Sequence, residues 1–129
     1  MKVLDSDLLV AILRGKNEAL AFVDGFSEGD AVTTSINSFE LFRGAFKSEN
    51  ADANLQKTSE LLSSMGVLVL DGQSSRIAGE IYARLEKSGS PLEIQDCLVA
   101  AITISNNAVL VTRNHKHFSR VSGLKIEKW

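Results

Sequence analysis

The stretch that decides the fold class is KVLDSDLLVAILRG, at residues 2–15. Val3 and Leu4 form a short apolar run that is typical of a strand, and polar residues follow it at once. Residues 8–13 are continuously apolar and predict a helix, with Asp7 or Ser6 as the N-cap. A strand that passes almost directly into a helix is typical of the crossover connections that join parallel strands.

The same alternation of strands and helices continues along the chain. The other predicted strands are residues 31–34, 67–70, 108–112 and 124–126. The other predicted helices are residues 17–26, 36–47, 51–65, 74–87 and 94–106. Strands separated by helices of this length favour a parallel sheet with helices on both faces. We therefore expect a single α/β domain over residues 1–129, a three-layer α/β/α sandwich around a central, mainly parallel sheet.

The composition is that of a folded domain. Of the 129 residues, 44% are hydrophobic and 23% are charged, which is typical of a globular rather than a disordered chain. The single cysteine, Cys97, excludes an internal disulfide framework and a zinc site with several cysteines. No apolar run approaches the ~18 residues of a spanning helix, and residues 1–13 lack the pattern of a secretory signal. We expect a cytoplasmic protein with no membrane segment.

Charge is unevenly distributed along the chain. The formal net charge is −2, which disfavours a protein that coats nucleic acid. Residues 113–129 nevertheless contain five Lys and Arg and one acid, a net charge of +4 that leaves −6 for the rest. This basic segment is either a solvated face or a local contact for an anion such as RNA phosphate.

Side chains with oxygen atoms follow several of the predicted strands or begin the helices after them. They are Asp5, Asp7, Thr34, Ser35, Glu40, Asp96, Thr112 and Asn114. Sites in parallel sheets gather beyond the carboxyl ends of the strands, so these residues are expected to converge there. Carboxylates without a nearby histidine or thiolate favour Mg²⁺ or Mn²⁺ over zinc.

Each of these residues also has a purely structural interpretation. Asp5 and Asp96 are in positions typical of turns or helix caps, and Glu40 is at the margin of an apolar stripe. His115 and His117 face the same way if their segment is extended, but two histidines without a third ligand are a weak metal signal. No Ser/His/Asp triad and no phosphate-binding glycine loop is present.

Four stretches, taken in order, resemble a known family. They are VLDSDLLVAILRG, SFELFRGA, QDCLVAAI and LVTRNHKHFSRVSGLKIEKW. Together they resemble the PIN-domain ribonucleases, most closely the VapC type, which is the toxin half of a type II toxin–antitoxin pair. This resemblance implies an endoribonuclease that depends on Mg²⁺ or Mn²⁺, an RNA substrate, a VapB-like antitoxin partner and a homodimer.

The resemblance also implies roles for individual residues. The implied metal ligands and catalytic acids are Asp5, Glu40 and Asp96, with Thr112 and Asn114 completing the catalytic set and Ser6 and Asp7 in support. Many relatives have aspartate where this chain has Asn114, which leaves open whether one or two ions bind. Arg113, His115 and Lys116 follow the strand at 108–112 and are the candidate RNA contacts, although Arg113 could instead pair with a carboxylate of the site or point to solvent.

Two other functions fit parts of the sequence. Asp5-Ser6-Asp7 matches the start of haloacid-dehalogenase-like phosphatases, but Leu9 stands where that family has threonine or valine. A catalytically silent PIN-like module that only binds a protein is the second alternative.

The helix at residues 36–47 carries more apolar side chains than one core-facing stripe requires. We expect Ile36, Phe39, Phe42 and Phe46 to form the stripe, with Leu41 well off its line. Part of the surface formed by Phe39, Leu41, Phe42 and Phe46, together with the helix at 51–65, is expected to contact a second subunit or the antitoxin.

Overall fold

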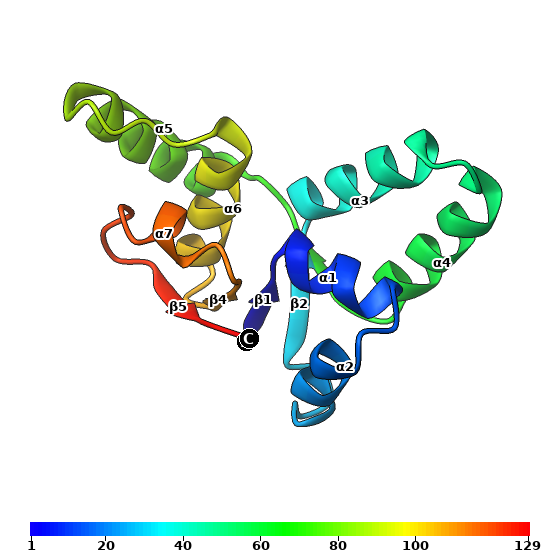
Figure 1. Cartoon of the computed structure of the whole chain (residues 1–129). Helices are drawn as coiled ribbons and strands as arrows, with labels where there is room; N and C mark the ends of the chain where they lie inside the picture. Colours follow the sequence, from blue (N-terminus) through cyan, green and yellow to red (C-terminus); the bar gives the residue numbers. More distant parts are fainter.

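The computed structural model describes residues 1–129 and contains one five-stranded sheet in the order β3-β2-β1-β4-β5 (Figure 1). The strands are β1 (Lys2–Leu4), β2 (Ala31–Thr34), β3 (Gly66–Leu68), β4 (Val109–Val111) and β5 (Lys125–Glu127). Every neighbouring pair is parallel. The predicted α/β sandwich is confirmed, and the sheet is wholly parallel.

Helices cover both faces of this sheet. They are α1 (Ser6–Leu13), α2 (Asn17–Asp24), α3 (Ser35–Lys47), α4 (Ala51–Ser63), α5 (Gly72–Lys87), α6 (Ile94–Ser105) and α7 (His115–Phe118). In Figure 1, α1 to α4 lie on one side of β1 and α5 to α7 on the other. None of the helices is both long and apolar enough to cross a membrane.

The alternation of side chains along the strands produces two apolar cores. Val3 of β1 and Leu110 of β4 belong to the core beneath α5 and α6. Their neighbours Leu4 and Val111 point to the opposite face and join the core beneath α1 to α4. Successive residues of a strand point to opposite faces, so one short strand contributes to both cores.

Two helices begin earlier than predicted. Asp5, not Asp7 or Ser6, caps α1 by accepting a hydrogen bond from the Ser6 backbone N–H. Helix α3 begins at Ser35, one residue before the predicted start, and Thr34 caps it by accepting a hydrogen bond from the Asn37 backbone N–H. In both places the strand runs into the helix without a loop: Asp5 directly follows β1, and Thr34 is itself the last residue of β2.

The segment after β4 is not extended. It forms the one-turn helix α7, which is anchored by the fully buried ring of Phe118. In a helix His115 and His117 do not face the same way, and His117 instead lies beside Asp96, with 3.6 Å between Nδ1 and Oδ2. A metal site built on the two histidines is therefore not supported.

The buried face of α3 differs from the predicted stripe. The fully or nearly buried residues are Asn37, Leu41 and Ala45, whereas Phe39 and Phe46 are exposed and Ile36 and Phe42 are half-buried. Leu41 thus belongs to the core and not to a docking surface. The smaller side chains line the face of α3 that packs against α1 and α4, and the larger rings lie on its flanks.

Phe118 provides a test of how α7 is held in place. We expect Phe118→Ala to lower the free energy of unfolding by about 3–5 kcal/mol, because it removes a fully buried ring. Phe46→Ala, the same change at a ring that is 67% exposed, should alter it by less than about 0.5 kcal/mol. Urea unfolding followed by circular dichroism measures both, and equal effects would contradict this packing.

Candidate active site

Asp5 lies at the junction of β1 and α1 and is only 6% exposed. Its Oδ1 accepts hydrogen bonds from the Ser6 backbone N–H at 2.9 Å and from Asn37 Nδ2 at 3.0 Å. Its Oδ2 accepts a hydrogen bond from Thr112 Oγ1 at 2.7 Å. Groups that follow β1, β2 and β4 therefore meet at one carboxylate, at the carboxyl edge of the sheet.

Asn37 is the part of this site that sequence reasoning missed. Its amide is fully buried, and Nδ2 donates to Ser6 Oγ at 2.9 Å as well as to Asp5. Its Oδ1 accepts from Thr34 Oγ1 at 2.7 Å. The sequence signal was the position of Asn37 one helical turn before Leu41, because residues four apart lie on the same face of a helix.

Thr112 links Asp5 to the segment that follows β4. Its hydroxyl is fully buried, donates to Asp5 and accepts from the Asn114 backbone N–H at 3.0 Å. The Asn114 side chain is exposed at the start of α7. Thr112 is thus part of the buried network, whereas the Asn114 amide is free to meet a ligand.

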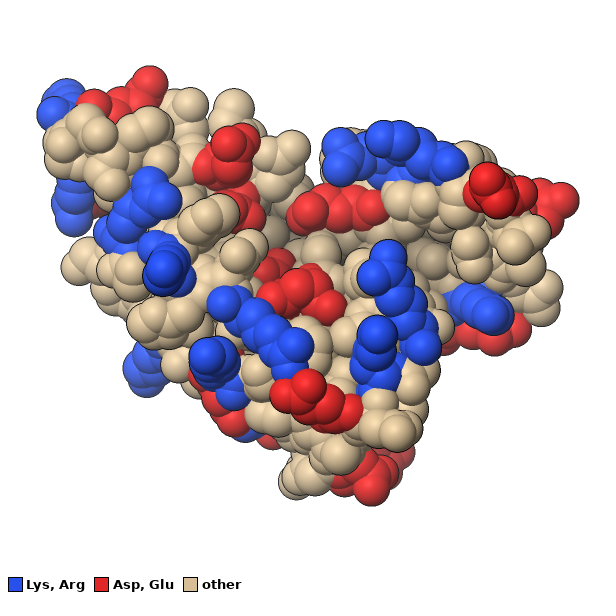
Figure 2. All heavy atoms as spheres, in the orientation of Figure 1, with Lys and Arg blue, Asp and Glu red and all other residues tan.

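Glu40 on α3 and Asp96 on α6 are both half-buried, and the charge of Asp96 acts on both Asp5 and Glu40. Burial raises the pKa of Glu40, and the Asp5 and Asp96 charges raise it further, while the Ser6 hydroxyl lowers it. Burial also raises the pKa of Asp96, an effect that the neighbouring His117 reduces. Figure 2 shows acidic side chains gathered in the central hollow, with Lys and Arg around its rim.

Of the three acids, Asp5 has the most clearly shifted pKa. Its pKa is raised to about 6, with burial as the largest cause and the charges of Asp7 and Asp96 as further contributions. The hydrogen bonds from Thr112 and Ser6 act in the opposite direction. For all three acids, desolvation by burial is a larger effect than repulsion between the acids.

Asp7 has a different role from Asp5, because its carboxylate is engaged by the end of the chain. Its Oδ2 accepts from the Arg113 backbone N–H at 2.8 Å, and its Oδ1 accepts from Trp129 Nε1 at 3.3 Å. The Arg113 guanidinium lies 3.6 Å from the centre of the Trp129 ring and forms an ion pair with Glu18. These contacts agree with a supporting role for Asp7.

The three candidate RNA contacts are therefore not equivalent. The Arg113 guanidinium already contacts Glu18 and the Trp129 ring, and neither of them is one of the three site acids. His115 and Lys116 are exposed on α7 and line a shallow basic hollow with Arg113 and Lys128. RNA contact by these residues stays a prediction.

The donor set fits a hard divalent cation in its chemistry. Asp5, Glu40 and Asp96 offer only carboxylate oxygens, which Mg²⁺ and Mn²⁺ prefer, and no thiolate competes because Cys97 is buried in the core. The side chains surround one hollow without forming a ready-made cluster of three ligands. A cation would offset the free energy that these desolvated acids cost.

Comparison with protein families and curated proteins gives consistent matches. A family model described as the PIN domain matches residues 2–124. The tRNA(fMet)-specific endonuclease VapC of Salmonella typhimurium is 30% identical over 127 residues, covering 98% of this chain and 96% of the relative. Ribonuclease VapC2 of Haemophilus influenzae is 30% identical over 129 residues, with the same coverage.

Solved structures with similar folds include two complexes bound to DNA. VapBC2 from Rickettsia felis, bound to a promoter fragment, has a chain with a TM-score of 0.92 and 26% identity, covering 99% of this chain and 98% of its own. VapBC from Salmonella typhimurium has a chain with a TM-score of 0.92 and 30% identity, covering 99% and 97%.

The raised pKa of Asp5 predicts a stability change that depends on pH. A folded pKa of about 6, against an ordinary 3.8, means that ionising Asp5 destabilises the fold as pH rises through this window. At pH 7, without divalent cations, Asp5→Asn should therefore raise the free energy of unfolding by up to about 3 kcal/mol. The gain should shrink towards pH 4.

Urea unfolding at several pH values measures this difference. Glu49→Gln, the same exchange of carboxylate for amide at an exposed position, serves as the control and should change little at any pH. A gain in Asp5→Asn that stays constant from pH 4 to 7 would show that Asp5 does not carry a raised pKa.

Proposed function

The chain belongs to the PIN domain family, and we propose that it is a divalent-metal-dependent endoribonuclease that acts as the toxin of a type II toxin–antitoxin pair. Its curated relatives, which match it over nearly their whole length, are named as VapC endonucleases and ribonucleases. The tRNA(fMet) in the relatives' names makes that RNA the first substrate to test.

The observation that carries the proposal is the set of three desolvated acids around one hollow. Buried carboxylates cost free energy unless an opposite charge compensates them. We propose that Asp5, Glu40 and Asp96 hold Mg²⁺ or Mn²⁺. Such an ion, when bound, activates water and stabilises the negative charge that develops on the scissile phosphate.

The other residues of the site position these acids and the RNA. Asn37 and Thr112 fix the orientation of the Asp5 carboxylate through their hydrogen bonds. The exposed Asn114 amide can donate a hydrogen bond to a phosphate oxygen. His115 and Lys116 lie just beyond it and would contact the RNA backbone, which adds affinity without reading bases.

The proposed partner is a VapB-like antitoxin. The Rickettsia felis and Salmonella typhimurium structures are VapBC assemblies bound to DNA, and their similar chains match nearly the whole of this one. We propose that this chain forms such a complex and also a homodimer, and that it acts on RNA in the cytoplasm. Phe39 and Phe46, which are 56% and 67% exposed, offer apolar surface for assembly.

Neither alternative function is favoured. The family model that matches residues 2–124 is the PIN domain, and Leu9 stands where the phosphatase family has threonine or valine. A silent binding module would keep three desolvated acids at a cost in stability and with no function to offset it.

RNA cleavage with and without divalent ions tests the proposal directly. We expect the purified chain to cleave tRNA(fMet) in the presence of Mg²⁺ or Mn²⁺. We expect this cleavage to stop when EDTA removes the ion. Asp96→Asn should keep the fold, checked by circular dichroism, and lower the cleavage rate by about 100-fold or more, because a ligand charge is lost.

Glu86→Gln is the control, since this exposed acid lies on α5 away from the hollow. It should cleave as the unmodified chain does. Cleavage that persists in EDTA, or at full rate in Asp96→Asn, would contradict the proposed metal site.

A further inference from the structure

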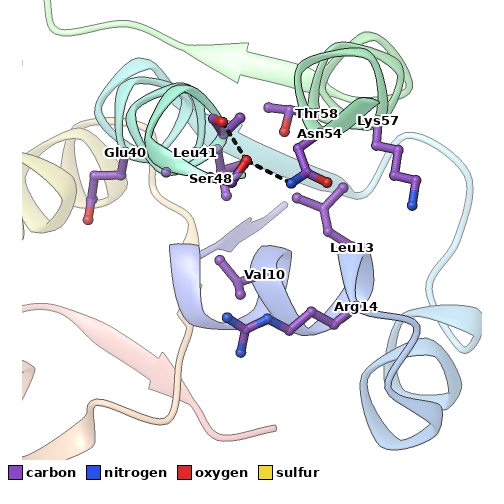
Figure 3. Close-up of a pocket in the computed structure, with 11 residues that line it drawn as sticks. Val10, Leu13, Arg14, Glu40, Leu41, Ser48, Asn54, Lys57 and Thr58 are labelled. Atoms are coloured by element: carbon purple, nitrogen blue, oxygen red, sulfur yellow. Dashed lines mark hydrogen bonds between the residues drawn. The ribbon is translucent and has the colours of Figure 1, made fainter. Parts of the chain in front are cut away.

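A separate pocket of about 290 Å³ opens between α1, α3 and α4 (Figure 3). Its walls include the apolar side chains of Val10, Leu13 and Leu41, and Glu40 lies at one end. Glu40 is also one of the three acids of the candidate active site, so the pocket lies next to that site. The volume is at the lower end of the about 300–1,000 Å³ typical of small-molecule sites, so it suits one small group.

Two cations flank this pocket without a protein partner. Arg14, at the end of α1, and Lys57, on α4, line it from opposite sides and are exposed (Figure 3). All the ion pairs in the structure involve other residues. Two unpaired cations that face one opening attract an anion and disfavour a basic ligand.

The interior of the pocket is suited to an uncharged group. Asn54 Nδ2 donates to Ser48 Oγ at 2.8 Å, and Ser48 donates to the Ala45 carbonyl at 2.7 Å. These bonds fix the Asn54 amide and leave its Oδ1 without a protein donor. With Glu40 nearby, the inner wall offers acceptors to an amino group and repels phosphate.

Gly44 keeps this space open. It lines the pocket from α3, and a Cβ atom built at this position meets no atom within 4 Å. Glycine lowers the stability of a helix interior by about 1 kcal/mol relative to alanine. A larger side chain at Gly44 would therefore fill the pocket without harming the helix.

We propose that this pocket binds one nucleotide of the RNA next to the scissile phosphate. The base lies among Val10, Leu13 and Leu41 with an amino group towards Asn54, and its phosphate lies at the opening between Arg14 and Lys57. This inference rests on the proposed ribonuclease function, because it places RNA across Glu40. It adds a contact that selects the nucleotide beside the cut.

Binding measurements in an inactive background test the pocket apart from cleavage. The probe is a short fluorescein-labelled single-stranded RNA that contains all four bases, and its affinity for Asp96→Asn protein is measured by anisotropy over a range of salt. Adding Gly44→Leu should raise Kd at least several-fold without changing the salt dependence. Adding Gly44→Ala, which leaves room for a base, should leave Kd unchanged.

Adding Arg14→Ala and Lys57→Ala together should weaken binding and flatten the salt dependence. Each lost phosphate contact on a single strand lowers the slope of log K against log salt by about 0.7. Arg76→Ala with Lys87→Ala removes the same charge from α5, on the other side of the sheet, and should change neither quantity (Figure 1).

The outcomes separate the pocket from the function. If the unmodified chain cleaves RNA but the Gly44→Leu and Arg14/Lys57 variants bind like the parent, the pocket proposal is wrong and the ribonuclease stands. If these variants keep RNA affinity but lose affinity for an antitoxin peptide, the pocket is a protein-binding site and the proposal is also wrong. A chain that neither binds nor cleaves RNA overturns the ribonuclease function itself.

Discussion

The Asp5 carboxylate accepts hydrogen bonds from Ser6, Asn37 and Thr112, and the geometry of the whole site depends on these contacts. A buried carboxylate without partners would cost several kcal/mol and would either protonate or pull the structure apart. Hydrogen bonds to a charged group contribute about 1.5–3 kcal/mol each, so three of them offset much of this cost. The same bonds fix β1, α3 and the end of β4 relative to one another.

Strand order explains why these groups can meet. β1 lies between β2 and β4, and the chain builds the sheet outward on one side before crossing to the other. In parallel sheets this reversal leaves a crevice at the carboxyl ends of the central strands. Asp5 follows β1, Asn37 follows β2 and Thr112 follows β4, so the crevice gathers them although they are far apart in sequence.

Much of this arrangement could be predicted from the sequence, because it depends on local patterns. Asp5 and Thr112 directly follow apolar strands, Asp96 is in the first turn of α6 and Glu40 is one turn further into α3, so the position of each at the sheet edge follows from element order. Asn37 and Leu41 could not be placed in this way, since their burial depends on how α3 rotates against α1 and α4. The one-turn helix α7 and the contact of Trp129 with Asp7 depend on long-range packing, which the hydrophobic periodicity of the sequence does not indicate.

The span of the contacts to Asp5 and Asp7 has a consequence for the chain during its synthesis. Thr112 lies 107 residues after Asp5, and Trp129 lies 122 residues after Asp7. Contacts of such separation form only after the intervening chain is available. A growing chain therefore carries Asp5 and Asp7 without the hydrogen bonds that orient them until β4 has been synthesised and can pair with β1. A partly synthesised chain of this design has the acids but not the organised site.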